Sequence, residues 1–477
     1  MRDAVSEMTD ADARLVTTLR EELGPGGWLE ADEIAARLID FRGVFLGKAL
    51  GLARPASTPE VAAVVRICAQ HGAFVVTQGG NTGLSGGAIP TGDRPTVLVT
   101  LSRMNRIDEV NPARSTITAQ AGVTIQAVQE AARDADRLFA PDWGARGSAT
   151  VGGGIATNAG GLNVVRYGTM REQVLGLEVV LADGRVWNGL RALPKDNSGF
   201  DLKQLFIASE GTIGIVTRAV LKLHPLPAEQ RIAFAGLRSL GDLNELFSMA
   251  RSSPPDALSA FELIPEIGVR QVVDRFGVTR PIESVCEWYV MLRFTGASGV
   301  GNDLVELLAT ASSRGLIADA AVAETTAHEE NLWLLRDELT ATRSFGGFGV
   351  KYDLAIPSDR IEEFLVAATA TVAGIVDGAV PYAFGHVGDG NLHFTVLRPG
   401  GDDAELEALA PAITSAVDEI VWSWGGTISA EHGLGRELRE RIVGQKPDVE
   451  LELMQRIKDT FDPDGLLNPG VMLPDAD

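Results

Sequence analysis

The sequence predicts an α+β protein of more than one domain, and three observations lead to this fold class. The chain has 477 residues, a length at which one hydrophobic core usually gives way to two or three domains. Its 53 glycines gather in a few short stretches, and their density falls after Leu226. Beyond that point amphipathic helices alternate with short apolar strands, the pattern of an antiparallel sheet covered by helices.

The first half is expected to open with short helices over residues 1–50. The stretch 57–71 is expected to be a helix, because it begins with a Ser-Thr-Pro-Glu start signal and its apolar residues recur with helical spacing. Short apolar runs then predict strands with one helix, 125–133, among them. These strands are expected at 74–76, 96–101, 117–122 and 174–181.

The second half shows two periodicities. Helical spacing predicts helices at 240–252, 302–313, 327–342 and 359–376. Apolar runs between them predict strands at 287–293, 350–356, 383–387 and 392–396. The chain is expected to end in helices and a tail rich in glycine and proline, 461–473.

Composition excludes several classes of function. The formal net charge of −22 argues against nucleic acid, which attracts basic surfaces, so an anionic ligand would need local cations. Two cysteines, Cys68 and Cys286, rule out a disulfide framework and favour a reducing compartment. The charged stretch 1–20 lacks the apolar core of a signal peptide, and no apolar run is long enough for a transmembrane helix. A cytoplasmic location is therefore expected.

Two glycine-rich segments predict a nucleotide site. Residues 78–87, Gln-Gly-Gly-Asn-Thr-Gly-Leu-Ser-Gly-Gly, follow an expected strand, and their backbone N–H groups can form a nest for phosphate. Residues 147–161 alternate small residues with hydroxyl and amide side chains, so a flat ligand can approach the backbone. A flexible surface loop and a close-packed helix crossing are the alternatives. Neither segment has the spacing of a pyridine-dinucleotide fingerprint or a P-loop.

Together the two segments resemble the FAD-binding domain of the para-cresol methylhydroxylase and vanillyl-alcohol oxidase type. The match continues at 167–168, 195–202 and 208–217, in the order of that family. The resemblance implies FAD, held non-covalently because Asn81 stands where covalent members often carry histidine. The residues it assigns to FAD are Gln78, Gly79, Gly80, Asn81, Thr82, Gly83, Gly147, Ser148, Thr150, Gly152, Gly153, Ala156, Thr157, Asn158, Gly160, Gly161, Tyr167, Gly168, Glu210, Gly211, Ile213, Ile215 and Asn468.

A histidine pair predicts a metal site in the second half. In Gly-His-Val-Gly-Asp-Gly-Asn-Leu-His, residues 385–393, the Asp-Gly pair is a hairpin signal between two apolar runs. His386 and His393 flank this turn symmetrically, and as cross-strand neighbours they can share one metal ion. The alternative is a pair of structural histidines joined by hydrogen bonds.

A second motif, Ser-Ala-Glu-His-Gly-Leu-Gly at 429–435, supplies a carboxylate and a further histidine. If the backbone is extended there, Glu431 and His432 point to opposite sides. Glu431 can then complete a metal set with open positions, while His432 faces a substrate. A helix-capping loop is the alternative interpretation.

Arg336, Thr340 and Lys351 form a candidate grip for a carboxylate. Arg336 and Thr340 are four residues apart on an expected helix and share a face, and Lys351 lies on the next expected strand. Without further support, an exposed face of surface salt bridges explains these residues better.

These features resemble the FAD-linked D-lactate, D-2-hydroxyglutarate and glycolate dehydrogenases. The resemblance implies that His386, His393 and Glu431 bind a divalent metal, usually zinc, that His432 is the catalytic base, and that Arg336, Thr340, Lys351 and His432 contact the substrate. It also implies four segments, which are an N-terminal helical segment 1–53, an FAD-binding domain 54–227, a substrate domain 228–425, and a C-terminal segment 426–477 that returns to the flavin.

The Arg336, Thr340 and Lys351 spacing looks most like the D-2-hydroxyglutarate branch, although Thr395 stands where this resemblance implies asparagine. The expected reaction is oxidation of a small anionic D-2-hydroxyacid, with an electron-transferring flavoprotein or a quinone as acceptor and a homodimer as assembly. Three alternatives stay open, namely a D-lactate or glycolate dehydrogenase, an oxidase that uses O₂, and a non-catalytic flavin-binding subunit.

Overall fold

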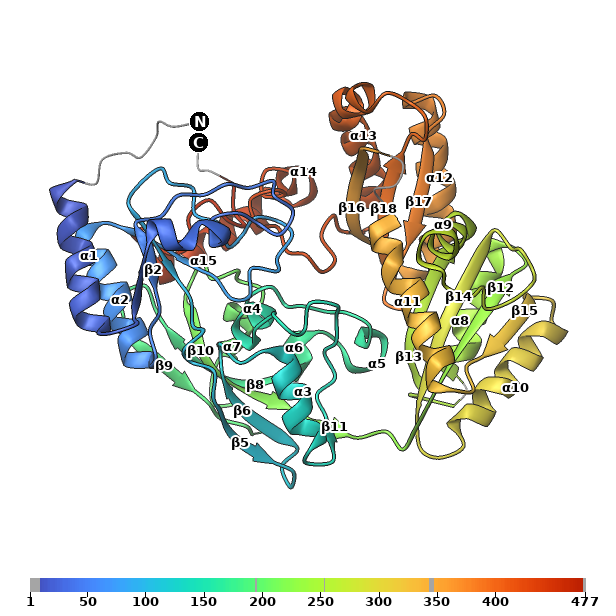
Figure 1. Cartoon of the computed structure of the whole chain (residues 1–477), viewed down its shortest axis with the longest axis horizontal. Coiled ribbons are helices and arrows are strands. Elements are labelled where there is room, and N and C mark those ends of the chain that lie inside the picture. The colour runs from blue at the N-terminus through green and yellow to red at the C-terminus, as the bar shows by residue number, and fades with distance from the viewer. Residues whose placement is uncertain (1–8, 194, 253, 343–346, 475–477) are drawn as a thin grey trace. The chain divides into compact units, whose positions relative to one another are not determined.

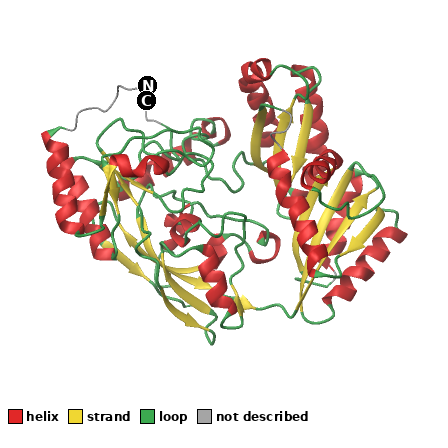
Figure 2. Ribbon diagram, viewed as in Figure 1, coloured by secondary structure: helices red, strands yellow, loops and turns green. Residues whose placement is uncertain are grey.

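The computed structural model describes residues 9–193, 195–252, 254–342 and 347–474, and these residues form two compact units (Figures 1 and 2). The first eight residues of the charged N-terminal stretch lie outside this description. Unit 1 comprises Met1–Ala159, Thr169–Leu226 and His432–Asp477. Unit 2 comprises Gly160–Gly168 and Pro227–Glu431.

Unit 1 contains a small, mostly parallel sheet packed against two helices. The helices α1 (Asp10–Leu23) and α2 (Thr58–His71) lie side by side (Figure 1). The sheet has the order β1-β2-β4-β3, and β2 and β3 both run parallel to β4. Its strands are β1 (Trp28–Glu30), β2 (Gly51–Ala53), β3 (Phe74–Thr77) and β4 (Thr96–Val99). The expectation of helices alone over residues 1–50 was wrong, because β1 is too short to show the alternation of a strand.

A second, antiparallel sheet of unit 1 carries the hydrophobic core beneath the glycine-rich segments. Its order is β5-β6-β10-β8-β9. The strands are β5 (Ile107–Asn111), β6 (Thr116–Gln120), β8 (Val174–Val180), β9 (Val186–Gly189) and β10 (Ile215–Lys222). Short elements join or cover it, namely α3 (Ile125–Arg133), β7 (Arg137–Leu138), α4 (Val151–Ala156), α6 (Met170–Gln173), α7 (Lys203–Phe206) and β11 (His224–Pro225).

The C-terminal tail returns to the first sheet of unit 1. After α14 (Ile442–Gln445) and α15 (Asp448–Phe461), Leu467 forms a parallel bridge with Val75 of β3. The backbone N–H of Asn468 donates to Val75 O at 2.8 Å, and Val75 N–H donates to Leu466 O at 2.9 Å. The tail therefore passes beside the strand that leads into the first glycine-rich loop.

Unit 2 begins with a four-stranded antiparallel sheet of order β13-β14-β12-β15. Its strands are β12 (Glu229–Leu237), β13 (Leu258–Pro265), β14 (Trp288–Gly296) and β15 (Ile317–Val322). Helices pack on it, namely η2 (Leu240–Asp242), α8 (Leu243–Ser252), α9 (Glu266–Phe276), α10 (Val300–Ser313) and α11 (Thr326–Thr342). The sequence did not predict β13, whose eight residues are all buried and so lack the alternation of a half-exposed strand.

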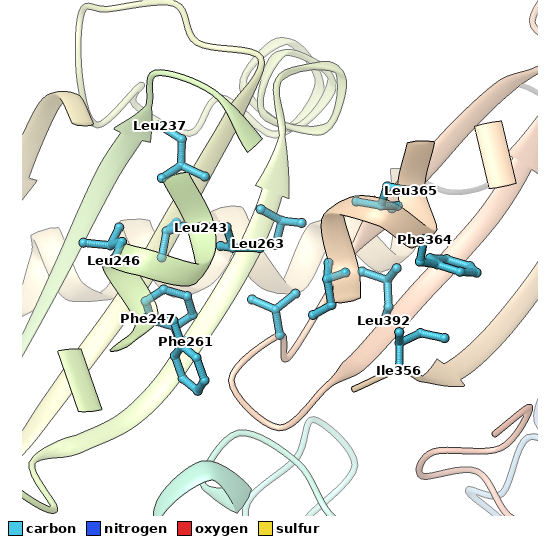
Figure 3. Packing of buried hydrophobic residues seen from close by; sticks show 14 of the residues in the cluster. Leu237, Leu243, Leu246, Phe247, Phe261, Leu263, Ile356, Phe364, Leu365 and Leu392 are labelled. Atoms are coloured by element: carbon cyan, nitrogen blue, oxygen red, sulfur yellow. The ribbon is translucent and has the colours of Figure 1, made fainter. Parts of the chain in front are cut away.

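A three-stranded sheet completes unit 2, with β18 (Asn391–Leu397) between β16 (Gly349–Ala355) and β17 (Val380–Phe384). The helices η3 (Ser358–Arg360), α12 (Ile361–Ile375) and α13 (Asp403–Ser423) accompany it. One hydrophobic cluster joins the two sheets, with Leu263 and Phe261 of β13 on one side and Leu392 and Phe364 on the other (Figure 3). A bridge between Leu263 and Gly385 fixes β13 to the end of β17.

The described residues include no helix that combines the length and hydropathy needed to cross a membrane. Both cysteines are free thiols, and Cys68 is buried. The two thiols therefore contribute no cross-link to either unit.

Candidate functional site

The two glycine-rich segments of unit 1 pack directly against each other. A Cβ atom on Gly80 would lie 2.0 Å from the backbone oxygen of Ser148, and one on Gly79 would lie 2.5 Å from Thr150 Oγ1. Thr150 in turn caps α4, because its Oγ1 accepts from Gly153 N–H at 3.2 Å. Glycine is required at 80 because the backbone of Ser148 touches it, and at 79 because the capping side chain of Thr150 does.

Several residues around these segments adopt left-handed backbone conformations that side chains disfavour. They are Asn81, Asn158, Ala208, Glu210 and Asn468. Asn81 Nδ2 donates to Ile39 O at 2.9 Å, and Asn158 Oδ1 accepts from Arg171 N–H at 2.9 Å. This concentration of strained residues is typical of a binding site whose backbone is held by its surroundings.

Asn468 gives the clearest sign of a ligand in unit 1. Its Nδ2 donates to Gly87 O at 2.9 Å and to Glu210 O at 2.6 Å, which ties the C-terminal tail to both loops. Its Oδ1 is buried and accepts no hydrogen bond from the described residues. Because buried polar atoms are normally paired, Oδ1 fits a ligand that donates an N–H, and the isoalloxazine of FAD has one.

The turn after His432 is fixed within unit 1 by the first glycine-rich loop. Ser85 Oγ donates to His432 O at 3.2 Å and to Gly433 O at 3.1 Å, and Ser85 O accepts from Arg436 N–H at 2.9 Å. Gly435 has a φ of +53°, and a Cβ there would lie 2.0 Å from Ser85 O. The Gly-Leu-Gly sequence after His432 is thus a tight turn against Ser85.

Glu210 holds the same turn from the other side. Its Oε1 accepts from Leu434 N–H at 2.8 Å, and its Oε2 accepts from Gly435 N–H at 2.9 Å. Burial raises the pKa of Glu210 to about 7, although both N–H groups favour the carboxylate. The sequence assigned Glu210 to FAD, whereas the structure places its carboxylate on the loop that follows His432.

The remaining residues assigned to FAD lie in four settings. Gln78 is buried, and its Nε2 donates to Arg37 O and Ala88 O, so its side chain holds the ends of the loop. Ile213 and Ile215 lie in the hydrophobic core. Others line or follow the two loops of unit 1, namely Thr82, Gly83, Gly147, Gly152, Ala156, Thr157 and Gly211. Gly160, Gly161, Tyr167 and Gly168 belong to unit 2.

The histidine motif of unit 2 forms a hairpin, but its register differs from the expected one. His393 pairs with Phe384 of β17 and with Asp353 of β16, so His386 is not its cross-strand neighbour. β17 ends at Phe384, and His386 lies in the connection that turns at Gly390, whose φ is +87°. The symmetric arrangement about Asp-Gly was therefore wrong, because the connection has six residues rather than two.

The two histidines nevertheless come together, and Glu431 joins them. The imidazole rings of His386 and His393 meet edge to face with centroids 5.8 Å apart, and each residue is 7 % exposed. His386 Nε2 lies 3.8 Å from Glu431 Oε1. Donor atoms of all three residues lie within 4.8 Å of one another, and Gly161 N–H donates to Glu431 Oε1 at 3.0 Å.

This donor set fits a divalent cation. Two ligand atoms on one tetrahedral zinc ion stand about 3.4 Å apart, since each bond is about 2.1 Å. The 3.8 Å separation of His386 and Glu431 needs only a small adjustment to reach that value. Two imidazoles and one carboxylate also match the set that leaves coordination positions open in catalytic zinc sites.

A buried carboxylate that the sequence did not single out, Glu262, lies behind His386. Glu262 Oε1 lies 2.6 Å from His386 Nδ1, and Glu262 Oε2 accepts from Arg336 Nε at 2.9 Å. Burial would raise the pKa of Glu262, but the two cationic partners lower it to about 2. Burial alone would lower the pKa of His386, but the Glu262 carboxylate outweighs burial, so the pKa of His386 is raised. The signal that was missed is one acidic residue in an otherwise apolar run, 260–265.

Asp353 of β16 stands behind His393 and Glu431. Its Oδ1 accepts from Asn391 Nδ2 at 2.8 Å and lies 3.6 Å from His393 Nδ1. Its Oδ2 accepts from Glu431 N–H at 2.9 Å. One carboxylate therefore positions the end of β18 and the Glu431 backbone together. The expected extended conformation at 431–432 is absent, because the chain bends there.

The three residues of the candidate carboxylate grip differ in exposure. Arg336 of α11 is buried, and one of its terminal nitrogens lies 3.1 Å from His386 Nε2. Thr340, one turn later on α11, is exposed. Lys351 is also exposed and pairs in register with Thr395, two residues before the pair of Asp353 with His393. A plain surface salt-bridge face does not describe Arg336, because it lies in the histidine cluster.

Comparison with known proteins places this architecture among flavoproteins. A family described as FAD binding domain matches residues 49–189, and one described as FAD linked oxidases, C-terminal domain, matches residues 226–472. The structure of p-cresol methylhydroxylase with substrate bound superposes with a TM-score of 0.72, at 17 % identity, over 97 % of each chain. The expected α+β fold of the para-cresol methylhydroxylase type is thereby confirmed.

Proteins named as D-2-hydroxyglutarate dehydrogenases are similar to this chain over most of their length. D-2-hydroxyglutarate dehydrogenase, mitochondrial, of Danio rerio is 36 % identical over 94 % of this chain and 82 % of its own. D-2-hydroxyglutarate dehydrogenase of Xanthomonas citri pv. viticola is 35 % identical over 88 % of each chain. These similarities extend across both units described above.

Proposed function

The chain belongs to the FAD-linked oxidase family that includes the D-2-hydroxyglutarate dehydrogenases, and we propose that it oxidises D-2-hydroxyglutarate to 2-oxoglutarate at a divalent metal site. It is an FAD-dependent oxidoreductase that acts on a small D-2-hydroxyacid. The observation that carries the finer proposal is the buried cluster of His386, His393 and Glu431 with Arg336 beside it.

In this proposal His386, His393 and Glu431 hold the metal ion, most simply zinc. When bound, the metal would lower the pKa of the substrate hydroxyl, and non-covalent FAD would accept the hydride from C2. Asp353 keeps Glu431 in place through its backbone N–H. Both histidines are buried, which limits competition from water for the same positions.

His432 is proposed as the base that takes the hydroxyl proton. Oxidation removes a hydride from C2 and a proton from the hydroxyl, so one protein group must accept that proton. The turn 433–435 is held by Ser85 and Glu210, which fixes the backbone from which His432 projects. His432 also follows Glu431 directly, so the proposed metal ligand and the proposed base are joined by one peptide bond.

Arg336, Thr340 and Lys351 are proposed to bind the substrate carboxylates. Arg336 offers a guanidinium fork at the cluster, and a carboxylate is its usual partner. Lys351 and Thr340 are exposed on neighbouring elements of unit 2, so they suit the distal carboxylate of a five-carbon diacid. A lactate dehydrogenase would not need this second cation.

Other features remain predictions. The electron acceptor is proposed to be an electron-transferring flavoprotein or a quinone, and the assembly a homodimer. The cytoplasmic location also stays a prediction, since several relatives carry mitochondrial in their names. An acceptor assay with each redox partner, and sedimentation of the purified protein, would test the first two.

The deciding experiment is anaerobic reduction of the bound flavin, followed by its visible absorbance. D-2-hydroxyglutarate, D-lactate, D-malate, glycolate and the L-enantiomers are added in turn to protein loaded with zinc. We expect rapid bleaching by D-2-hydroxyglutarate alone. Bleaching by D-lactate or glycolate instead would reassign the substrate and remove the distal-carboxylate role of Lys351.

The metal requires a separate measurement. Zinc content after dialysis is compared for the native protein and for His393→Ala, with FAD content as the control for folding. We expect His393→Ala to lose zinc and flavin reduction together while it keeps FAD. Full flavin reduction in a protein that holds no metal would contradict the metal site and leave the family assignment intact.

A further inference from the structure

The position of Glu262 follows from the pairing of β13 with the end of β17. Leu263 and Gly385 exchange backbone hydrogen bonds, with Leu263 N–H donating at 2.9 Å and Gly385 N–H donating at 3.2 Å. Gly388 N–H also donates to Phe261 O at 3.1 Å. The loop that carries His386 is therefore fixed to the backbone on both sides of Glu262.

Alternation along β13 then directs Glu262 away from the main core. Phe261 and Leu263 point into the cluster shared by the two sheets (Figure 3), while Ile264 joins the cluster that α11 covers. Because neighbours in a strand face opposite sides, Glu262 shares the face of Ile264 and meets α11. Its side chain is only 1 % exposed.

Each oxygen of Glu262 has a different partner. Oε1 lies 2.6 Å from His386 Nδ1, and Oε2 lies 2.9 Å from Arg336 Nε. The contact between Glu262 and Arg336 uses Nε of the guanidinium, so the two terminal nitrogens of Arg336 can contact the histidine cluster. One buried carboxylate thus touches a proposed metal ligand and a proposed substrate cation.

The same contacts set the tautomer of His386. A guanidinium can only donate, so the 3.1 Å contact from Arg336 to His386 Nε2 assigns the lone pair to Nε2. The ring hydrogen then lies on Nδ1 and is donated to Glu262. Nε2 lies 3.8 Å from the proposed metal donor Glu431 Oε1, and its single lone pair can bind either Arg336, as in this structure, or the metal.

We propose that Glu262 is a positioning residue that holds His386 in its metal-binding tautomer and orients Arg336 toward the substrate carboxylate. The inference rests on the proposed function and deepens it. Metal-bound histidines commonly donate their second ring N–H to a carboxylate, and removing that carboxylate weakens metal binding about 10- to 100-fold. Glu262 differs from a simple outer ligand because the substrate cation depends on its second oxygen.

Glu262→Gln is the sharpest perturbation because the two side chains have nearly the same shape. Its amide offers one acceptor and one donor, whereas both Nδ1–H of His386 and Nε–H of Arg336 need acceptors. In one orientation the amide –NH₂ points at Nε–H of Arg336, so two donors face each other. In the other orientation the –NH₂ points at His386 Nδ1, which must then accept, and the ring hydrogen moves to Nε2. No orientation preserves both contacts.

The test uses the full-length protein with FAD bound. Zinc affinity is measured by competition with a chromophoric chelator, and kcat and KM are measured for D-2-hydroxyglutarate. We expect Glu262→Gln to bind zinc about 10- to 100-fold more weakly and to show a raised KM at saturating zinc. FAD content should not change, because most of the residues assigned to FAD, Asn468 among them, belong to unit 1, whereas Glu262 belongs to unit 2.

A matched control and a second variant separate positioning from folding. Glu266→Gln removes another carboxylate of unit 2, which pairs with Arg280, and should leave zinc affinity and KM as in the native protein. Glu262→Asp keeps the buried charge but is one methylene too short to reach both partners. We expect it to lose zinc affinity or raise KM even if Glu262→Gln does not fold.

The outcomes are distinguishable from failure of the proposed function. If the native protein neither binds zinc nor oxidises a D-2-hydroxyacid, the proposed function fails. If the native protein does both, and folded Glu262→Gln or Glu262→Asp matches it in zinc affinity and KM, the positioning role is overturned and the proposed function stands.

Discussion

Gly80→Ala tests whether close contact between the two glycine-rich segments creates the flavin site. In the structure a Cβ on Gly80 would lie 2.0 Å from Ser148 O, whereas ordinary contacts begin at 3.4 Å. The two backbones would have to separate by 3.4 − 2.0 = 1.4 Å, and neither atom belongs to a side chain that can rotate away. Such overpacking costs about 1–3 kcal/mol.

If that cost falls on the conformation that binds FAD, affinity should decrease about 5- to 150-fold, since 1.4 kcal/mol corresponds to a factor of about ten. The assay is titration of flavin-free protein with FAD, followed by quenching of flavin fluorescence. Far-ultraviolet circular dichroism checks that the variant folds. Native-like FAD affinity in folded Gly80→Ala would refute the reasoning.

Two companion variants sharpen the result. Gly144→Ala adds the same methyl group where, chain neighbours apart, no atom of the described residues lies within 4 Å, and it is outside the residues assigned to FAD, so it should bind FAD normally. Gly83 also has open space around its Cα but belongs to the first loop. Loss of FAD in Gly83→Ala would therefore report contact with the ligand itself, because no atom in the described part of the chain opposes the new methyl group.

Three further predictions concern a proposed substrate cation of unit 2 and two residues of unit 1 that hold the turn after His432. Lys351→Met should raise KM for D-2-hydroxyglutarate about 10-fold or more through loss of a charged hydrogen bond, and leave KM for D-lactate unchanged in the same assay. Gly435→Ala would place Cβ 2.0 Å from Ser85 O, so kcat should fall while zinc content stays native; Gly374→Ala, with open space in α12, should leave kcat unchanged. Burial raises the pKa of Glu210 from 4.5 to about 7, so the folded state binds more protons than the unfolded state in that interval. The contribution of this group to the free energy of unfolding is therefore fully present below pH 4.5 and declines by up to about 3 kcal/mol as the pH rises to about 7. Glu210→Gln should flatten that decline when stability is measured by urea unfolding. An unchanged dependence of stability on pH would mean that Glu210 does not titrate in this interval.

Much of the fold could be predicted from the sequence where local signals are strong. The helix over Thr58–His71 begins at the predicted cap, and β16 and β18 lie within one residue of their expected ends. The strand Leu258–Pro265 was missed because burial on both faces removes the alternation that marks a strand. The same strand carries Glu262, so the missed element also hid a residue of the site.

The site residues likewise divide into those that sequence motifs predict and those that only strand pairing brings to the site. Motifs predicted that His386, His393 and Glu431 come together, and the structure brings their donor atoms within 4.8 Å. The register that achieves this could not be predicted, because it depends on the bridge from β13 to Gly385, which joins residues more than 120 positions apart. Contacts of this range leave no periodic signal in the sequence, so Glu262 and Asp353 emerge only when the strands are in place.

The net charge of −22 raises the question of how such a protein attracts an anion. In unit 2, the described side chains in contact with His386 and His393 include three carboxylates and one guanidinium, which gives −3 + 1 = −2 when both histidines are neutral, as metal ligands have to be. They are Glu262, Asp353, Glu431 and Arg336. A hydroxyacid would be repelled by this cluster alone, whereas a divalent cation would bring the sum to zero. Since binding coupling is reciprocal, D-2-hydroxyglutarate should then also tighten the binding of zinc, and the same chelator competition, repeated with and without substrate, measures that coupling directly.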